Sequence, residues 1–271
     1  MLKKIVQFIE KLAWALFNVL PPSAVRYQKR ESVFQKKGPS TLVVTIDYDK
    51  FQKRKNKTVG KTTYSCGKEG LEHVLAYCQA QKLDYIDVIT TDDQGAPSSY
   101  DGEANRTICI RNGGSDIAAL EAISATVSRY EFLIVVNSSA SVIDAQNFHL
   151  VYREMLNNKS GHFVIGCNGN SRISPRLPIS PAVTPHIITN FFACRTSDVL
   201  QTLDHARELS LYSLVKGFAN KYFAIRYFEI LLSRNAVFNG GTLIMLKDHD
   251  VKRYRQTNDV WPRVDSRLLP R

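Results

Sequence analysis

The segment from Tyr130 to Val136 restricts the fold more than any other feature, because every residue in it except Glu131 is apolar. Its length is that of a β-strand, and a strand without a polar face must be covered on both sides. Sheets with helices on both faces are typical of α/β domains. We therefore expect an α/β fold with a doubly wound, mostly parallel sheet.

Strand and helix patterns alternate on both sides of this segment. In chain order they are a strand at 41–46, a helix at 69–81, strands at 85–91 and 107–110, a helix opened by 111–116 and running to about 128, a strand at 161–167, an apolar run at 186–195 leading into a helix at 197–203, a helix from 210 to about 237, and a strand within 238–246. In such sheets ligands bind beyond the carboxyl ends of the strands. Four polar residues come at predicted strand ends: Asp47, Asp92, Asp93 and Asn137.

The composition agrees with one large folded unit, since 271 residues with 44% hydrophobic content suffice for a full core. No apolar run is long enough to cross a bilayer. The cysteines are scattered, without a Cys-x-x-Cys spacing, and we expect buried thiols in a reducing, cytoplasmic compartment. They are Cys66, Cys78, Cys109, Cys167 and Cys194.

The net charge of +11 is concentrated near the start of the chain. Residues 1–61 contain 14 Lys/Arg against 4 Asp/Glu, whereas residues 62–271 contain 22 against 21. A nearly neutral body argues against nucleic acid as a partner.

Residues 2–20 have the pattern of an amphipathic helix. Their polar side chains fall within an arc of about 120° at helical spacing, and Pro21-Pro22 ends the pattern because proline has no amide donor. We expect 1–37 to associate with a membrane and the basic residues of 1–61 to contact its anionic surface. The alternative is a helix docked on the protein's own core, followed by a solvated basic loop.

Two of the strand ends suggest nucleotide binding. Asp92 and Asp93 can accept hydrogen bonds from a base or ribose, and Gly113-Gly114 before a helix can admit a diphosphate to backbone amides. Each stretch also has a plainer interpretation, as a turn and as a capped loop.

In their order, the segments 92–95, 111–120 and 130–139 resemble the GT-A glycosyltransferase fold. They are similar to family 2 and to the rhamnan-synthesis type of polysaccharide glycosyltransferase. The resemblance implies that the acidic pair contacts the base and that the Asn112-Gly113 segment precedes a donor-site helix. The predicted donor-binding residues are Asp47, Asp92, Asp93, Asn112, Gly113, Asp116, Asn137, Ser138 and Ser139.

The resemblance also implies a divalent metal, Mn or Mg, held by an Asp-x-Asp where this chain has Asn137-Ser138-Ser139. Neutral Asn and Ser oxygens are poor ligands for a hard cation. Either the reaction is metal-independent, with basic groups stabilising the diphosphate, or ligands come from elsewhere. The candidates elsewhere are Asp248, His249 and Asp250, for which a solvated polar turn is the plainer interpretation.

In the second half, the loop at 171–185 is long enough to be an acceptor loop. The resemblance makes His186, Asn190 and Arg195 candidates for acceptor binding. It also makes Glu229, within 228–234, the candidate catalytic base. The alternative is a polar residue on an amphipathic helix.

These observations divide the chain into the membrane-associating segment 1–37 and a GT-A-like domain at 38–271. Within the domain we expect a nucleotide-binding half at 38–140, an acceptor half at 141–250 and a basic tail at 251–271. The predicted function is transfer of a sugar from a nucleotide-sugar donor to a polysaccharide or lipid-linked glycan acceptor at a membrane surface. A non-catalytic scaffold and a sugar-phosphate nucleotidyltransferase remain alternatives. The sequence has no Gly-rich phosphate loop after the first predicted strand, which argues against the nucleotidyltransferase.

Overall fold

The structure is a computed structural model that describes residues 40–48, 57–59, 62–64, 68–138, 140, 145–167, 169–172, 182–208, 228–247 and 250–254. The predicted membrane-associating segment 1–37 lies outside these residues. So do Ser139, Asp248 and His249, together with most of the predicted acceptor loop, of the helix at 210–237 and of the basic tail.

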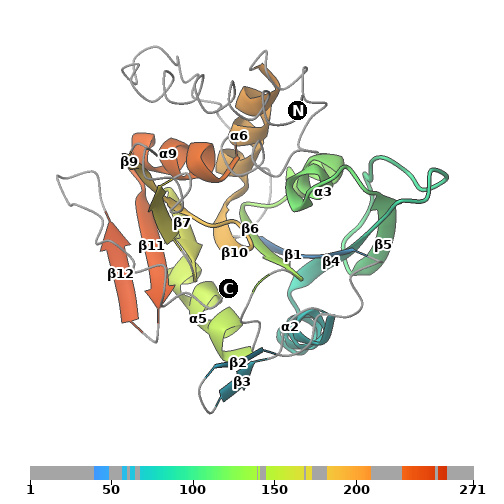
Figure 1. The fold of residues 1–271 in the computed structure, drawn as a ribbon, viewed down its shortest axis with the longest axis horizontal. Coiled ribbons are helices and arrows are strands. Elements are labelled where there is room, and N and C mark those ends of the chain that lie inside the picture. Colours follow the sequence, from blue (N-terminus) through green and yellow to red (C-terminus); the bar gives the residue numbers. More distant parts are fainter. Residues whose placement is uncertain are drawn as a thin grey trace, which may run out of the picture.

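An eight-stranded sheet forms the centre of the molecule, in the order β12-β11-β7-β10-β6-β1-β4-β5 (Figure 1). In that order the strands are Asp250–Tyr254, Thr242–Lys247, Phe163–Gly166, Phe191–Arg195, Phe132–Asn137, Thr41–Tyr48, Asp84–Thr91 and Arg106–Arg111. Within this sheet only β10 and β12 are antiparallel to their neighbours. The expected α/β fold with a doubly wound, mostly parallel sheet is confirmed, and its narrower assignment to the GT-A type stays a prediction.

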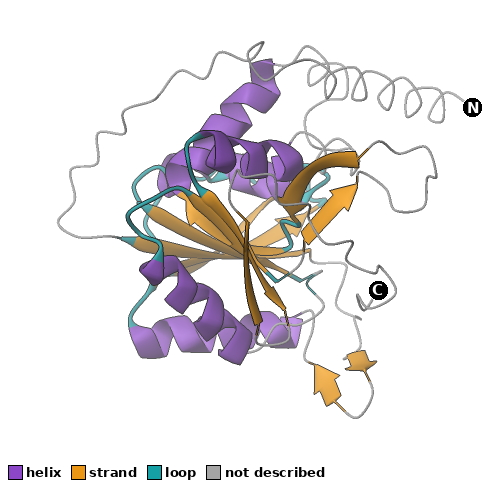
Figure 2. Cartoon of the chain, turned by 90° about the vertical axis from the view of Figure 1, so that its left-hand side faces the viewer, coloured by secondary structure: helices purple, strands orange, loops and turns teal. Residues whose placement is uncertain are grey.

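Helices cover both faces of the sheet, which makes three layers (Figure 2). One face packs against α2 (Lys68–Gln81) and α5 (Ala145–Asn157), and the other against α3 (Asp116–Ala122), α4 (Ser124–Val127), α6 (Thr196–Glu208) and α9 (Ile230–Phe238). Side chains alternate between the two cores, so that Val43 joins the first and Leu42 and Val44 the second.

The apolar segment of the sequence is the central strand β6. All of its residues are buried, and Val43 of β1 lies opposite Ile134 in parallel register. The ring of Phe132 stacks on that of Phe163 with 5.9 Å between centroids. The expectation that this strand has helices on both faces is therefore confirmed, because its alternate side chains enter the two cores.

Several boundaries differ from those expected from the sequence. The predicted helix from 116 to about 128 is interrupted at Ile123, whose ψ of 11° ends α3 before α4 begins. The predicted acceptor loop begins and ends in a hairpin of β8 (Gly169–Arg172) and β9 (Ala182–Ile187). Helix α5, the hairpin of β2 (Lys57–Val59) with β3 (Thr62–Tyr64), and the edge strand β12 were not expected from the sequence.

The structure also bears on the membrane and cysteine expectations. None of the helices in the described part is both long and apolar enough to span a bilayer. Cys66 lies outside the described residues, Cys78 and Cys194 are buried as expected, but Cys167 is only half-buried and Cys109 is exposed. The reason is that β5 is an edge strand whose alternate residues, Ile108 and Ile110, face the core while the others face outward.

Candidate functional site

The parallel direction of β1, β4, β5 and β6 brings their carboxyl ends to one edge of the sheet. Asp47, Asp92, Asn112 and Asn137 all lie at or just beyond these ends. Since β10 is antiparallel to β6, the start of β10 lies at the same edge. Asp47, Asp92 and Asn137 thus lie at strand ends as predicted, together with Asp93, which directly follows Asp92, and Asn112 lies at the same edge.

Asp92 forms the centre of a polar group that joins three strands. Tyr48 Oη at the end of β1 donates to Asp92 Oδ2 at 2.6 Å, and Asn112 Nδ2 after β5 donates to Asp92 Oδ1 at 3.0 Å. Two donors fix the orientation of this exposed carboxylate. Asp47 contributes its carbonyl oxygen, which accepts from Thr90 Oγ1, while its carboxylate accepts from the Tyr48 amide.

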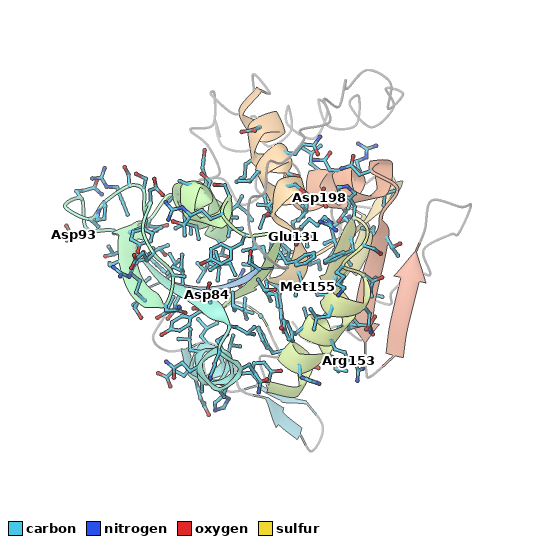
Figure 3. The ribbon with its side chains drawn as sticks, turned by 180° about the vertical axis from the view of Figure 1, so that it is seen from behind. Asp84, Asp93, Glu131, Arg153, Met155 and Asp198 are labelled. Atoms are coloured by element: carbon cyan, nitrogen blue, oxygen red, sulfur yellow. The ribbon has the colours of Figure 1, made fainter. Side chains whose placement is uncertain are left out.

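Asp93 does not share this arrangement. Its Oδ1 accepts the Gly95 N–H at 2.9 Å, which is the hydrogen bond of a turn closed by an Asp side chain. In Figure 3 the labelled Asp93 lies at the outer edge of the molecule, whereas Glu131 lies near its centre. The plainer interpretation as a turn accounts for the contacts of Asp93, and its role in donor binding stays a prediction.

The segment before α3 is a tight loop with local reasons for its glycines. A Cβ on Gly113 would come within 2.5 Å of Ala118 Cβ, and Gly114 has a φ of 88°. Asn112 Oδ1 accepts the Gly114 N–H at 2.8 Å, and Ser115 caps α3 by accepting from the Ala118 amide. Packing and capping thus explain this sequence without a diphosphate, so its role as a donor site stays a prediction.

Asn137 is paired with the first residue of α3. Its Nδ2 donates to Asp116 Oδ2 at 2.7 Å, and Asn137 is only 3% exposed. Ser138 extends this contact zone, since its amide donates to the Ile46 carbonyl of β1 at 2.9 Å. Sequence order alone separates Asn137 and Asp116 by 21 residues, and the structure brings them into direct contact.

This pair does not fit a divalent cation. The group that faces the Asp116 carboxylate is an amide N–H donor, where a hard cation would require a second negative oxygen. In the described ranges no group of three or more His, Cys, Asp or Glu side chains could hold a metal ion. The donor set at Asn137 therefore disagrees with a divalent cation.

Glu229 lies next to the same edge of the sheet. It is 8% exposed, directly before α9, and its Oε1 accepts from both the amide and the Oγ1 of Thr189 at 3.1 Å each. The neighbouring Asn190 carbonyl accepts the Asn137 amide at 2.9 Å. Glu229 and Asn137 are thus connected through Thr189 and Asn190, which are consecutive residues of one turn.

His186 lies in β9, the strand that precedes β10 in the chain, and its side chain is 2% exposed. Strand β9 is attached to α9 by the Ile187 amide, which donates to Ser233 Oγ at 3.0 Å. His186 is thus almost wholly buried, whereas Asn190 is half-buried at the edge itself, and the role of each in acceptor binding stays a prediction.

Arg195, the third predicted acceptor residue, lies far from Asn190 and Asn137. It lies opposite Phe132 at the start of β6, so five residues of strand, or about 16 Å, separate it from the level of Asn137. Its guanidinium donates to the Gly161 carbonyl at 2.7 Å and to Glu131 Oε1 at 3.0 Å, and it covers the Phe132 ring. These contacts are explained by packing at the opposite edge of the sheet, and a role of Arg195 in acceptor binding stays a prediction.

Asp250 is also separated from Asn137. It begins β12, opposite Lys247, and four strand spacings, or about 19 Å, lie between β12 and β6. The structure therefore does not bring Asp250 to the donor-site candidates, and Asp248 and His249 are outside the described residues.

Two residues at this edge, Tyr48 and Thr189, were not predicted from the sequence as site residues. Tyr48 ends the first strand beside the predicted Asp47, so its position alone could have identified it. Thr189 had no such signal, because its partner Glu229 is 40 residues away in the chain.

Comparison with protein-family models returned no match, and comparison with curated proteins returned none either. Among solved structures, the chain is similar to the 2-C-methyl-D-erythritol 4-phosphate cytidylyltransferase from Thermus thermophilus, with 13% sequence identity and a TM-score of 0.34. The match covers 77% of this chain and 89% of the cytidylyltransferase chain. The narrower resemblance to family 2 and rhamnan-synthesis enzymes stays a prediction.

Proposed function

We propose that the chain is a glycosyltransferase that moves a sugar from a nucleotide-sugar donor to a polysaccharide or lipid-linked glycan acceptor. The observation that supports this most is the connection of Glu229, through Thr189 and Asn190, to Asn137 at the end of the central strand. This connection links a buried carboxylate to the carboxyl edge of the sheet, and Asp92 and Asn112 lie along the same edge.

In the proposed reaction Glu229 is the general base. Its carboxylate takes the proton of an acceptor hydroxyl while that oxygen attacks the anomeric carbon of the donor. The bond between this carbon and the diphosphate oxygen breaks, and the nucleoside diphosphate leaves with the electron pair. Direct displacement of this kind inverts the configuration at the anomeric carbon.

On the donor side, Asp92 and Asn112 are the proposed contacts of the nucleoside. Asp92 is held by Tyr48 and Asn112, so its acceptor oxygens are positioned before a base or ribose arrives. The leaving diphosphate requires positive charge. Arg111, the exposed last residue of β5, is a basic side chain next to Asn112 at this edge.

A donor screen tests the proposal. The full chain is titrated with UDP-, GDP-, CMP- and dTDP-sugars, each with EDTA and with Mn²⁺, while thermal shift and calorimetry report binding. We expect one donor class to raise the Tm and to be hydrolysed slowly to its nucleotide. An Asp92→Asn variant serves as a control, because it should weaken that donor while the fold is kept.

The alternatives give other outcomes in the same experiment. Release of pyrophosphate from a nucleoside triphosphate and a sugar phosphate would replace the proposal with a nucleotidyltransferase. No Tm shift with any donor or triphosphate would favour a scaffold that has kept the fold.

We further propose that the protein is cytoplasmic and peripherally bound to an anionic membrane surface through residues 1–61. The support is the amphipathic pattern at 2–20 and the excess of basic residues in 1–61. Flotation with vesicles that contain anionic lipid should recover the full chain but not a chain that starts at residue 38. Equal flotation of both chains would refute the membrane role.

A further inference from the structure

The contact between Asn137 and Asp116 occupies the place where the resembling enzymes hold a cation. If residue 137 were Asp, two carboxylates would face each other at the distance of the present hydrogen bond, 2.7 Å. Two like charges so close must share a proton or bind a cation. Asn has almost the same shape as Asp, carries no charge, and donates an N–H to the carboxylate instead.

The surroundings hold this pair in place. Asn137 ends a strand whose residues are all buried, and its backbone amide donates to the Asn190 carbonyl at 2.9 Å. The following amide, that of Ser138, donates to the Ile46 carbonyl. Asp116 is fixed as the first residue of α3, behind the Ser115 cap. Backbone hydrogen bonds therefore hold the segment of the donor Asn137, and the capped start of α3 holds the acceptor Asp116.

The remaining ligands at this position are neutral. A cation bound between Asp116 Oδ2 and residue 137 would have to displace the Asn137 N–H, and the side chain of Asn137 could then offer it only a neutral amide oxygen. Mg²⁺ and Mn²⁺ prefer carboxylate oxygens and phosphate. The donor set thus disagrees with the metal that the fold resemblance implies.

We propose that the side-chain amide of Asn137 replaces the divalent cation at this position and holds Asp116 in place, so that donor binding needs no bridging metal. The pairing of Asn137 with Asp116 concerns the chain alone, whereas metal-free donor binding rests on the proposed function.

The test compares three full-length chains: the wild type, Asn137→Asp, and the exchange variant Asp116→Asn/Asn137→Asp. The readouts are the Tm in EDTA and in Mn²⁺, and Mn²⁺ binding followed by electron paramagnetic resonance without nucleotide. We expect Asn137→Asp to lose several degrees of Tm in EDTA and to recover them with stoichiometric Mn²⁺. The wild type and the exchange variant both contain one amide and one carboxylate. For each of these two chains, the Tm in Mn²⁺ should equal the Tm in EDTA.

Stoichiometric Mn²⁺ binding by the wild type would overturn the proposal, and so would an Asn137→Asp chain whose Tm does not respond to Mn²⁺. If Asn137→Asp does not fold in EDTA, a folded exchange variant supports the pairing and an unfolded one refutes it. A further arm adds the nucleotide-sugar that gives the largest Tm shift in the donor screen. In the wild type this Tm shift should persist in EDTA, whereas in Asn137→Asp it should require Mn²⁺. If no donor binds, the proposed function fails, but the arms without nucleotide still decide the role of Asn137.

Discussion

Replacing Glu229 by Gln separates its proposed chemical role from its structural one. Glu229 Oε1 accepts two hydrogen bonds from Thr189, at 3.1 Å each. The amide oxygen of Gln can accept both, so the side chain should keep its position and volume while losing the ability to take a proton.

The expected magnitudes follow from these contacts. A general base contributes about 10² to 10⁴ in rate, which corresponds to about 3–5 kcal/mol of barrier. For stability, two hydrogen bonds change from charged to neutral acceptors, at a cost of about 1 kcal/mol each. Removing the charge of a side chain that is 8% exposed offsets part of this cost. The change in Tm should therefore be small beside the change in rate.

The assay measures initial rates of nucleoside diphosphate release and, separately, the Kd of the donor by calorimetry. We expect kcat to fall by about two to four orders of magnitude with the donor Kd almost unchanged. Thr189→Val, which removes one donor to the carboxylate, should lower kcat less, and the matched control Thr189→Ser should retain activity. Unchanged turnover in Glu229→Gln would remove this residue from the mechanism.

Three further predictions concern the core, the thiols and the edge opposite the site. Phe132→Ala should cost about 3–5 kcal/mol in urea unfolding because Phe132 is fully buried, and an unchanged midpoint would contradict the central place of β6. Burial raises the pKa of Cys78 from 9.0 to about 12, so the free energy of unfolding should fall as the pH rises from about 9 to 12. When the native protein is treated with an alkylating reagent, mass spectrometry should detect modification of the exposed Cys109 long before that of the buried Cys78 or Cys194. Arg195→Met should lower stability by about 1–3 kcal/mol without a change in the kcat of the folded protein, whereas a selective loss of acceptor binding would return Arg195 to the site.

Local patterns were sufficient for the strands on which the fold depends. The apolar run that became β6 and the alternation around β1, α2 and β4 are visible within a few residues of sequence. The parallel direction of these strands then places Asp92 and Asn112 together, as expected. Contacts between distant turns have no local pattern, which is why the bond of Thr189 to Glu229, 40 residues along the chain, could not be predicted.

The direction of β10 determines where the predicted acceptor residues lie. An apolar run indicates a strand but not which way it runs. If β10 were parallel to β6, Arg195 would lie at the carboxyl edge and Asn190 at the opposite one. Because β10 is antiparallel, the turn at 189–190 meets Asn137 instead, and the same turn holds Glu229. The reversed direction of β10 therefore connects the proposed catalytic base to the proposed donor edge.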